Sequence, residues 1–132
     1  MKFSSSLKDG VLVFTLKGKI MGGPESTEFH DELKKAVNSG QRKLVMDLGD
    51  VEWMNSSGLG LLISALTTAR NSGGEMKLAR ATDKITSLLV ITKLNSVFDS
   101  HPSVPAAAAS FKEGGGPSRD IRSPAAGARS SR

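Results

Sequence analysis

The feature that most constrains the fold is an alternation of two kinds of apolar pattern between residues 43 and 79. The run KLVMDL, residues 43–48, is short and almost wholly apolar, as in a strand buried on both faces of a sheet. A helical apolar pattern follows, and the alternating run EMKLA, residues 75–79, indicates another strand. Consecutive strands joined by a helix are parallel, and the helix packs on their sheet. The predicted core positions of this helix are Leu59, Leu61, Leu62, Ile63, Ala65 and Leu66.

The N-terminal segment, FSSSLKDGVLVFTLKGKI, predicts a β-hairpin. Asp9-Gly10 is a strong turn signal, and the second arm, Val11 to Lys17, is rich in β-branched and apolar residues. Gly18 is expected to end that arm. The hairpin would add an antiparallel edge to parallel strands, so we predict a mixed β-sheet.

The remaining elements complete one predicted domain over residues 1–113. A helix is expected to open at Pro24 and to stop at Asn38-Ser39-Gly40, and a turn at Gly49-Asp50 is expected to end the strand before it. Further along, the patterns predict a helix over 82–93, a short strand at Val97-Phe98 and an alanine-rich helix from Ser103 to about Lys112. The fold class is therefore a single α/β domain, a mixed β-sheet with helices packed on it.

Residues 114–132, GGGPSRDIRSPAAGARSSR, differ in kind from the rest of the chain. They hold too few apolar residues to build a core, so we interpret them as a disordered tail or a remnant of cloning. This tail holds four arginines and one aspartate, which give +3 of the chain's net charge of +5. The rest of the chain is nearly balanced in charge. We therefore expect no specific nucleic-acid partner.

Composition narrows the class of protein further. The chain has no cysteine and only two histidines, His30 and His101, far apart in sequence, so disulfides and thiolate metal sites are excluded and no metal or cofactor is predicted. No apolar run approaches the roughly 18 residues of a membrane span. We expect a cytoplasmic protein with no membrane span.

The stretch MNSSGLGLL, residues 54–62, places two hydroxyls directly before a helix, and four interpretations are open. Ser56 or Asn55 can cap the helix. A nucleophilic serine would need a base, and the G-x-S-x-G pattern is absent. A phosphate-binding loop would need a glycine-rich pattern that is also absent. The fourth interpretation is phosphorylation, because free N–H groups and the positive end of the helix dipole favour a phosphate there.

The sequence DLGDVEWMNSSGLGLLISA resembles the STAS domain of anti-sigma factor antagonists, in which a strand leads through a short turn and an aromatic residue to (Asp/Asn)-Ser-Ser-Gly-Leu-Gly. The resemblance covers about residues 3–112 and includes GKI after the second strand and KLNSVFDSHPSVPAAAASF near the end. It implies an interaction protein and not an enzyme.

In this family, the antagonist binds a serine-kinase anti-sigma factor and so releases a sigma factor. The kinase phosphorylates the first serine of the pair, which ends binding, and a metal-dependent serine phosphatase restores it. The resemblance thus implies that Ser56 is the phosphorylation site, with Ser57 as a secondary acceptor. The partner-binding residues it implies are Met21, Gly22, Asn55, Ser56, Ser57, Gly58 and Leu59.

Two departures from the family pattern concern the partner. Well-known members carry Asp directly before the serine pair, where this chain has Asn55, and often an acidic residue where this chain has Lys19-Ile20-Met21. An alternative function is therefore a STAS subunit that is not phosphorylated, in a lipid-transport complex or a signalling scaffold, and a serine hydrolase is a further alternative. Trp53 could pack against the sheet edge or contact a partner, and Asp47 could hold the loop or be solvated.

Overall fold

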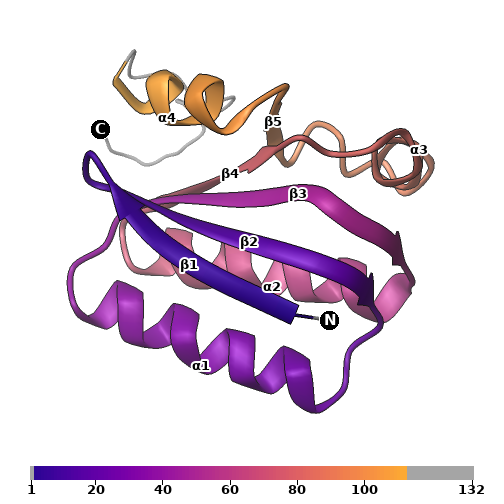
Figure 1. Ribbon diagram of the computed structural model, residues 1–132, viewed down its shortest axis with the longest axis horizontal. Helices are drawn as coiled ribbons and strands as arrows, with labels where there is room; N and C mark the ends of the chain where they lie inside the picture. Colours follow the sequence, from indigo (N-terminus) through magenta and orange to yellow (C-terminus); the bar gives the residue numbers. More distant parts are fainter. Residues whose placement is uncertain (1, 113–132) are drawn as a thin grey trace.

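The computed structural model describes residues 2–112 of the 132-residue chain, which form a hairpin followed by helices and strands in alternation (Figure 1). The tail predicted over 114–132 lies outside the described residues. In chain order the elements are β1 (Lys2–Lys8), β2 (Val11–Ile20), α1 (Pro24–Asn38), β3 (Lys43–Met54), α2 (Ser56–Asn71), β4 (Glu75–Ala79), α3 (Asp83–Ile91), β5 (Asp99–His101) and α4 (Val104–Lys112).

The strands form one mixed sheet in the order β1-β2-β3-β4-β5, which confirms the predicted fold class. The β1–β2 hairpin is antiparallel around the Asp9-Gly10 turn, and the other neighbours are parallel. Parallel pairing follows from the helices that connect these strands. None of the helices within residues 2–112 is both long and apolar enough to cross a membrane.

Helices cover both faces of the sheet. Figure 1 shows α1 and α2 on one face and α4 on the other, with α3 near the carboxyl ends of the central strands. Most of the core lies under α1 and α2, where Phe29 packs edge-on between Phe3 and Phe14, with ring centroids 5.5 and 5.1 Å apart. A smaller cluster under α4 includes Val45 and Ala107. The strand β3 is thus buried on both faces, as its sequence predicts.

Both central strands run further than the sequence predicts. β2 continues through Gly18, the expected end, to Ile20, and β3 passes the expected turn at Gly49-Asp50 and ends at Met54. The register between the two strands shifts twice along this stretch. These β-bulges take up extra residues of β3 while the pairing continues, so the glycines bend the strands and do not end them.

Two other predictions were wrong in position. Val97 and Phe98 form a turn, in which their amides donate to the Leu94 carbonyl at 3.0 and 3.3 Å, and the strand begins at Asp99. Phe98 is apolar because it is buried in the larger cluster, and not because it belongs to a strand. Ile63 of α2 is 38% exposed, since the buried face of this helix centres on its leucines and two alanines.

A charged cluster around the buried Lys77 links β4, β5 and α4. The ammonium of Lys77, wholly buried, donates to Asp99 Oδ2 at 2.7 Å and lies 4.9 Å from the centre of the Phe111 ring. His101 Nε2 lies 2.9 Å from the same oxygen. Burial alone would raise the pKa of Asp99, but the hydrogen bonds and charges of Lys77 and His101 outweigh it and hold that pKa below its ordinary value.

We expect Asp99→Asn to lower the free energy of unfolding at neutral pH by about 2 kcal/mol, because it weakens charge-assisted hydrogen bonds. The pKa of Asp99 is lower in the folded than in the unfolded chain. Its stabilising contribution is therefore fully present above the unfolded pKa and is lost as the pH falls through the folded pKa. The difference between wild type and variant should shrink below about pH 4, measured by urea unfolding across a pH series. A difference that stays constant on acidification would contradict this.

Candidate functional site

The end of β3 runs directly into α2, and Asn55 makes the junction. Its backbone is extended, and its side-chain Oδ1 accepts a hydrogen bond from the Gly58 amide at 2.9 Å. Asn55 is therefore the N-cap, which settles a choice that the sequence leaves open between Asn55 and Ser56. Ser56 is the first residue of the helix.

The end of β2 lies against this junction. The Asn55 amide donates to the Ile20 carbonyl at 3.3 Å, and a Cβ placed on Gly58 would overlap that same carbonyl oxygen. Met21 and Gly22 follow Ile20 directly, so the structure brings them beside the start of α2. The segments 21–22 and 55–59, predicted as one partner-binding site from separate parts of the sequence, are therefore adjacent.

The two serines differ in their surroundings, although both are exposed. Ser57 lines a groove between α1 and α2, and its Cβ lies 3.1 Å from where a Cβ on Gly22 would be. Ser56 does not line that groove. Ser57 thus faces the groove beside Gly22, whereas Ser56 stands on the first turn of α2 outside it.

Two of the predicted partner-binding residues are buried. Gly58 packs against Ile20, and Leu59 is 6% exposed and belongs to the larger core cluster. Their role at this site is to fix the helix start against the sheet. The exposed part of the predicted site consists of Met21, Ser56 and Ser57, with Gly22 and Asn55 half-buried.

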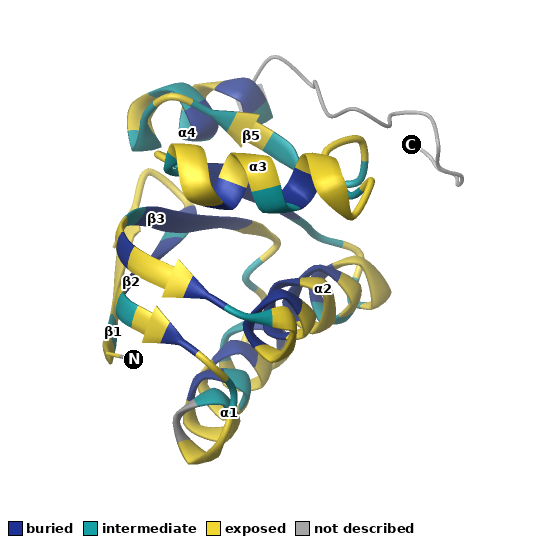
Figure 2. Ribbon diagram, turned by 90° about the vertical axis from the view of Figure 1, so that its right-hand side faces the viewer, coloured by how far each residue is buried: buried dark blue, intermediate teal, exposed yellow. Residues whose placement is uncertain are grey.

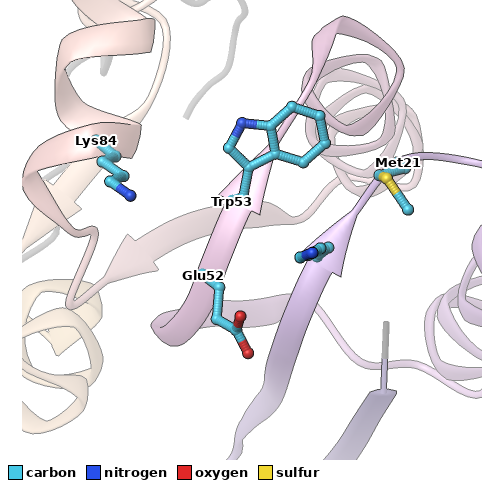
Figure 3. Close-up of a pocket in the computed structure, with 5 residues that line it drawn as sticks. Met21, Glu52, Trp53 and Lys84 are labelled. Atoms are coloured by element: carbon cyan, nitrogen blue, oxygen red, sulfur yellow. The ribbon is translucent and has the colours of Figure 1, made fainter.

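An open depression lies at the carboxyl ends of β2 and β3, with a volume of about 510 Å³. We call it the Trp53 depression; its lining residues are Lys19, Met21, Glu52, Trp53 and Lys84. Trp53 is 44% exposed and lies between Lys84 of α3 and Met21 (Figure 3). The sequence left open whether Trp53 packs or is available to a partner, and this exposure favours the second. Lys84 could not be predicted from the sequence as part of this site, because only the fold brings α3 next to the ends of β2 and β3.

The Asp47 side chain is buried and forms an ion pair that the sequence does not reveal. Arg80 donates to both of its carboxylate oxygens, at 2.8 and 2.9 Å, and its guanidinium occupies the space beside Gly49 that a Cβ would fill. Hydrogen bonding to Asp47 and its negative charge raise the pKa of Arg80 above its ordinary value. The pair joins the middle of β3 to the residue that directly follows β4.

Among residues 2–112, no group of three His, Asp or Glu side chains is arranged to hold a metal ion. His30 Nε2 lies 3.4 Å from Thr68 Oγ1, and His101 contacts Asp99. The described contacts of both histidines are therefore to residues other than the serine pair.

Residues 3–107 match the STAS domain, and the chain therefore belongs to the STAS domain family. The order of elements and the capped Ser-Ser-Gly turn described above agree with the resemblance seen in the sequence.

Named relatives point to one group within the family. BtrV of Bordetella bronchiseptica, named as a candidate anti-sigma factor antagonist, is 30% identical over 112 residues, which cover 85% of this chain and 96% of that protein. A solved candidate anti-sigma factor antagonist from Thermotoga maritima is 22% identical, with a TM-score of 0.75 over 83% of this chain and 94% of its own. Phosphorylated SpoIIAA, a Bacillus cell-fate determinant, is 14% identical, with a TM-score of 0.65 over 82% and 98%. The chain thus has the fold of anti-sigma factor antagonists.

We expect Gly58→Ala to lower the free energy of unfolding by about 2 kcal/mol, because a methyl group would push β2 and α2 apart at the Ile20 carbonyl. Gly60→Ala in the same helix is the matched control, since a Cβ there meets nothing within 4 Å and should stabilise the helix by about 1 kcal/mol. Chemical denaturation measures both. Equal effects of the two substitutions would contradict the close contact.

We expect Asn55→Ala to cost about 1 kcal/mol of unfolding free energy, because the Gly58 amide loses its acceptor. Asn55→Asp should retain the cap and wild-type stability, since a carboxylate accepts the same hydrogen bond and suits a helix N-terminus. Thermal unfolding of the two variants checks this. Loss of stability in Asn55→Asp as large as in Asn55→Ala would argue against the cap.

Proposed function

We propose that this chain is a cytoplasmic anti-sigma factor antagonist that binds a serine-kinase anti-sigma factor, thereby releasing a sigma factor. Phosphorylation of Ser56 ends binding, and a metal-dependent serine phosphatase restores it. The single observation that carries the proposal is Ser56 itself, exposed on the first turn of a capped helix beside exposed Met21 and Trp53. We assign this function to the domain over residues 1–113.

The helix start is chemically suited to a phosphoserine. The first N–H groups of α2 have no partner within the helix, and the helix dipole is positive at this end. The cap occupies only the Gly58 amide among them. A phosphate on Ser56 would bring about −1.5 to −2 charges at neutral pH without disturbing the buried residues below it. Such a group could end binding and leave the fold intact.

The comparison with SpoIIAA supports this kind of regulation. That protein, which shares the fold, is known in a phosphorylated form. Asn55 caps the helix as an aspartate would but adds no charge beside Ser56, so the helix start is retained while the charge that a partner meets is different. We infer that the cognate kinase tolerates a neutral residue before its target serine.

The two alternative functions make different demands. A STAS subunit of a lipid-transport complex or a signalling scaffold would use the same surface with Ser56 unmodified. A serine hydrolase would need a base at the serine, but the described contacts of His30 and His101 are to Thr68 and Asp99. The geometry therefore disfavours the hydrolase, and phosphorylation of Ser56 is what distinguishes the regulatory function from the other assemblies.

Incubation with ATP and the serine-kinase anti-sigma factor of the same organism tests the proposal. Mass spectrometry should find one phosphate on Ser56, which Ser56→Ala abolishes and Ser57→Ala retains, since Ser57 faces the groove beside Gly22. Kinase binding by calorimetry should persist in Ser56→Ala and weaken at least tenfold in Ser56→Asp.

No phosphate on Ser56, together with wild-type affinity in Ser56→Asp, would overturn the switch. A copurifying transporter ATPase would favour the transport assembly. Esterase activity that Ser56→Ala removes would favour the hydrolase.

A further inference from the structure

We infer that the Trp53 depression recognises a segment of the partner protein in which acidic side chains flank an apolar one. This inference deepens the proposed function, on which it rests, by giving the chemistry of the partner. The occupant is argued from the exposed apolar centre of the depression and from the charges around it.

The apolar centre consists of two large side chains left in contact with solvent. Met21 is 52% and Trp53 44% exposed, although both flank the buried ends of β2 and β3. Trp53 pairs with Lys19 in the strand register, so the indole and the lysine stem lie side by side on neighbouring strands. Aromatic and methionine side chains that are exposed together on a surface are typical of interaction sites.

The charges around this centre are mainly positive. Lys19 of β2 and Lys84 of α3 line the depression from separate elements, against one carboxylate, Glu52. Figure 3 shows Lys84 on the side of the indole opposite Met21. Within residues 2–112, neither lysine forms an ion pair, and both are exposed. Their ammonium groups are therefore available to carboxylates of a partner, while Met21 and Trp53 contact its apolar side chain.

This charge pattern also explains how a phosphate on Ser56 would act. Ser56 follows Trp53 by three positions, and its neighbour Asn55 is uncharged. A phosphate of about −1.5 to −2 charges would reverse the sign of a surface whose excess charge comes from two lysines. An acidic partner, attracted by the unmodified surface, would then be repelled.

The full chain offers a direct reporter, because Trp53 is its only tryptophan. The test titrates two capped peptides, GEDLFDEG and GKKLFKKG, at low salt and follows tryptophan emission. We expect the acidic peptide to bind about tenfold more tightly than the basic one. The double variant Lys19→Glu and Lys84→Glu should reverse this preference, and Ser56→Glu should weaken the acidic peptide about threefold.

The matched control is the double variant Lys8→Glu and Lys43→Glu. It makes the same change in net charge at exposed lysines near the opposite end of the sheet, and it should keep the preference for the acidic peptide. Far-UV circular dichroism confirms that each variant is folded.

Several results would overturn the inference. The first is equal binding of the two peptides, and the second is a preference for the acidic peptide that persists in the Lys19→Glu and Lys84→Glu double variant. The third is an emission change with phosphatidylglycerol vesicles but not with the acidic peptide. A change that follows protein concentration alone would indicate a second copy of the chain instead. Phosphate transfer to Ser56 is measured separately, so loss of the peptide preference with an intact switch refutes only the partner chemistry. A preserved preference without phosphorylation refutes only the proposed switch.

Discussion

The pairing of β2 with β3 is the constraint on which the rest of the structure depends. β3 is buried on both faces, so β2 and β4 and the helices above and below all take their positions from it. The bulged ends of these two strands reach beyond the other strands and carry Met21 and Trp53 to the edge of the sheet (Figures 1 and 3). At the same point the Ile20 carbonyl accepts a hydrogen bond from the backbone N–H of Asn55 and lies close to Gly58. The position of the serine pair is therefore fixed by these backbone contacts together with the side-chain cap of Asn55 and the burial of Leu59.

The helices α1 and α2 each have a buried face and a solvent-exposed face. Figure 2 shows the buried faces of α1 and α2 turned toward the sheet and their exposed faces turned outward. Along the five residues from Asn55 to Leu59, burial changes from the exposed serines to the buried Gly58 and Leu59. A partner can thus contact the first turn of α2 without disturbing the core. This short distance between a fixed backbone and an exposed hydroxyl is what a reversible binding surface requires.

The sequence predicts the elements well where local pattern decides them. A short apolar run locates β3, a period-two pattern locates β4, and helical apolar patterns locate the helices. Together they predict the mixed sheet because hairpin and crossover connections differ in length. Prediction from the sequence fails where contacts between distant residues determine the structure. Gly18 and Gly49 look like strand ends, but bulges keep both within the sheet, and Phe98 looks like a strand residue because it is a core residue. The ion pairs Asp47–Arg80 and Lys77–Asp99 join residues 33 and 22 positions apart, so no local pattern announces them. Asn55, Ser56 and Met21 are expected at the site because of the resemblance to a known family, whereas Lys84 lies on a separate element that only the fold brings there.

The two ends of the Asn55 side-chain amide differ in their part in the structure. Only its oxygen is used by the helix, and the other end of the side chain has no part in the cap. Asparagine and aspartate can therefore exchange at this position with the helix unchanged, while the outward group alternates between a hydrogen-bond donor and a negative charge. Members of the family that differ at this position can therefore differ in surface charge and keep the same scaffold. A cap of this kind lets the charge beside the serine pair change, and with it the preferred partner, without an intermediate that fails to fold.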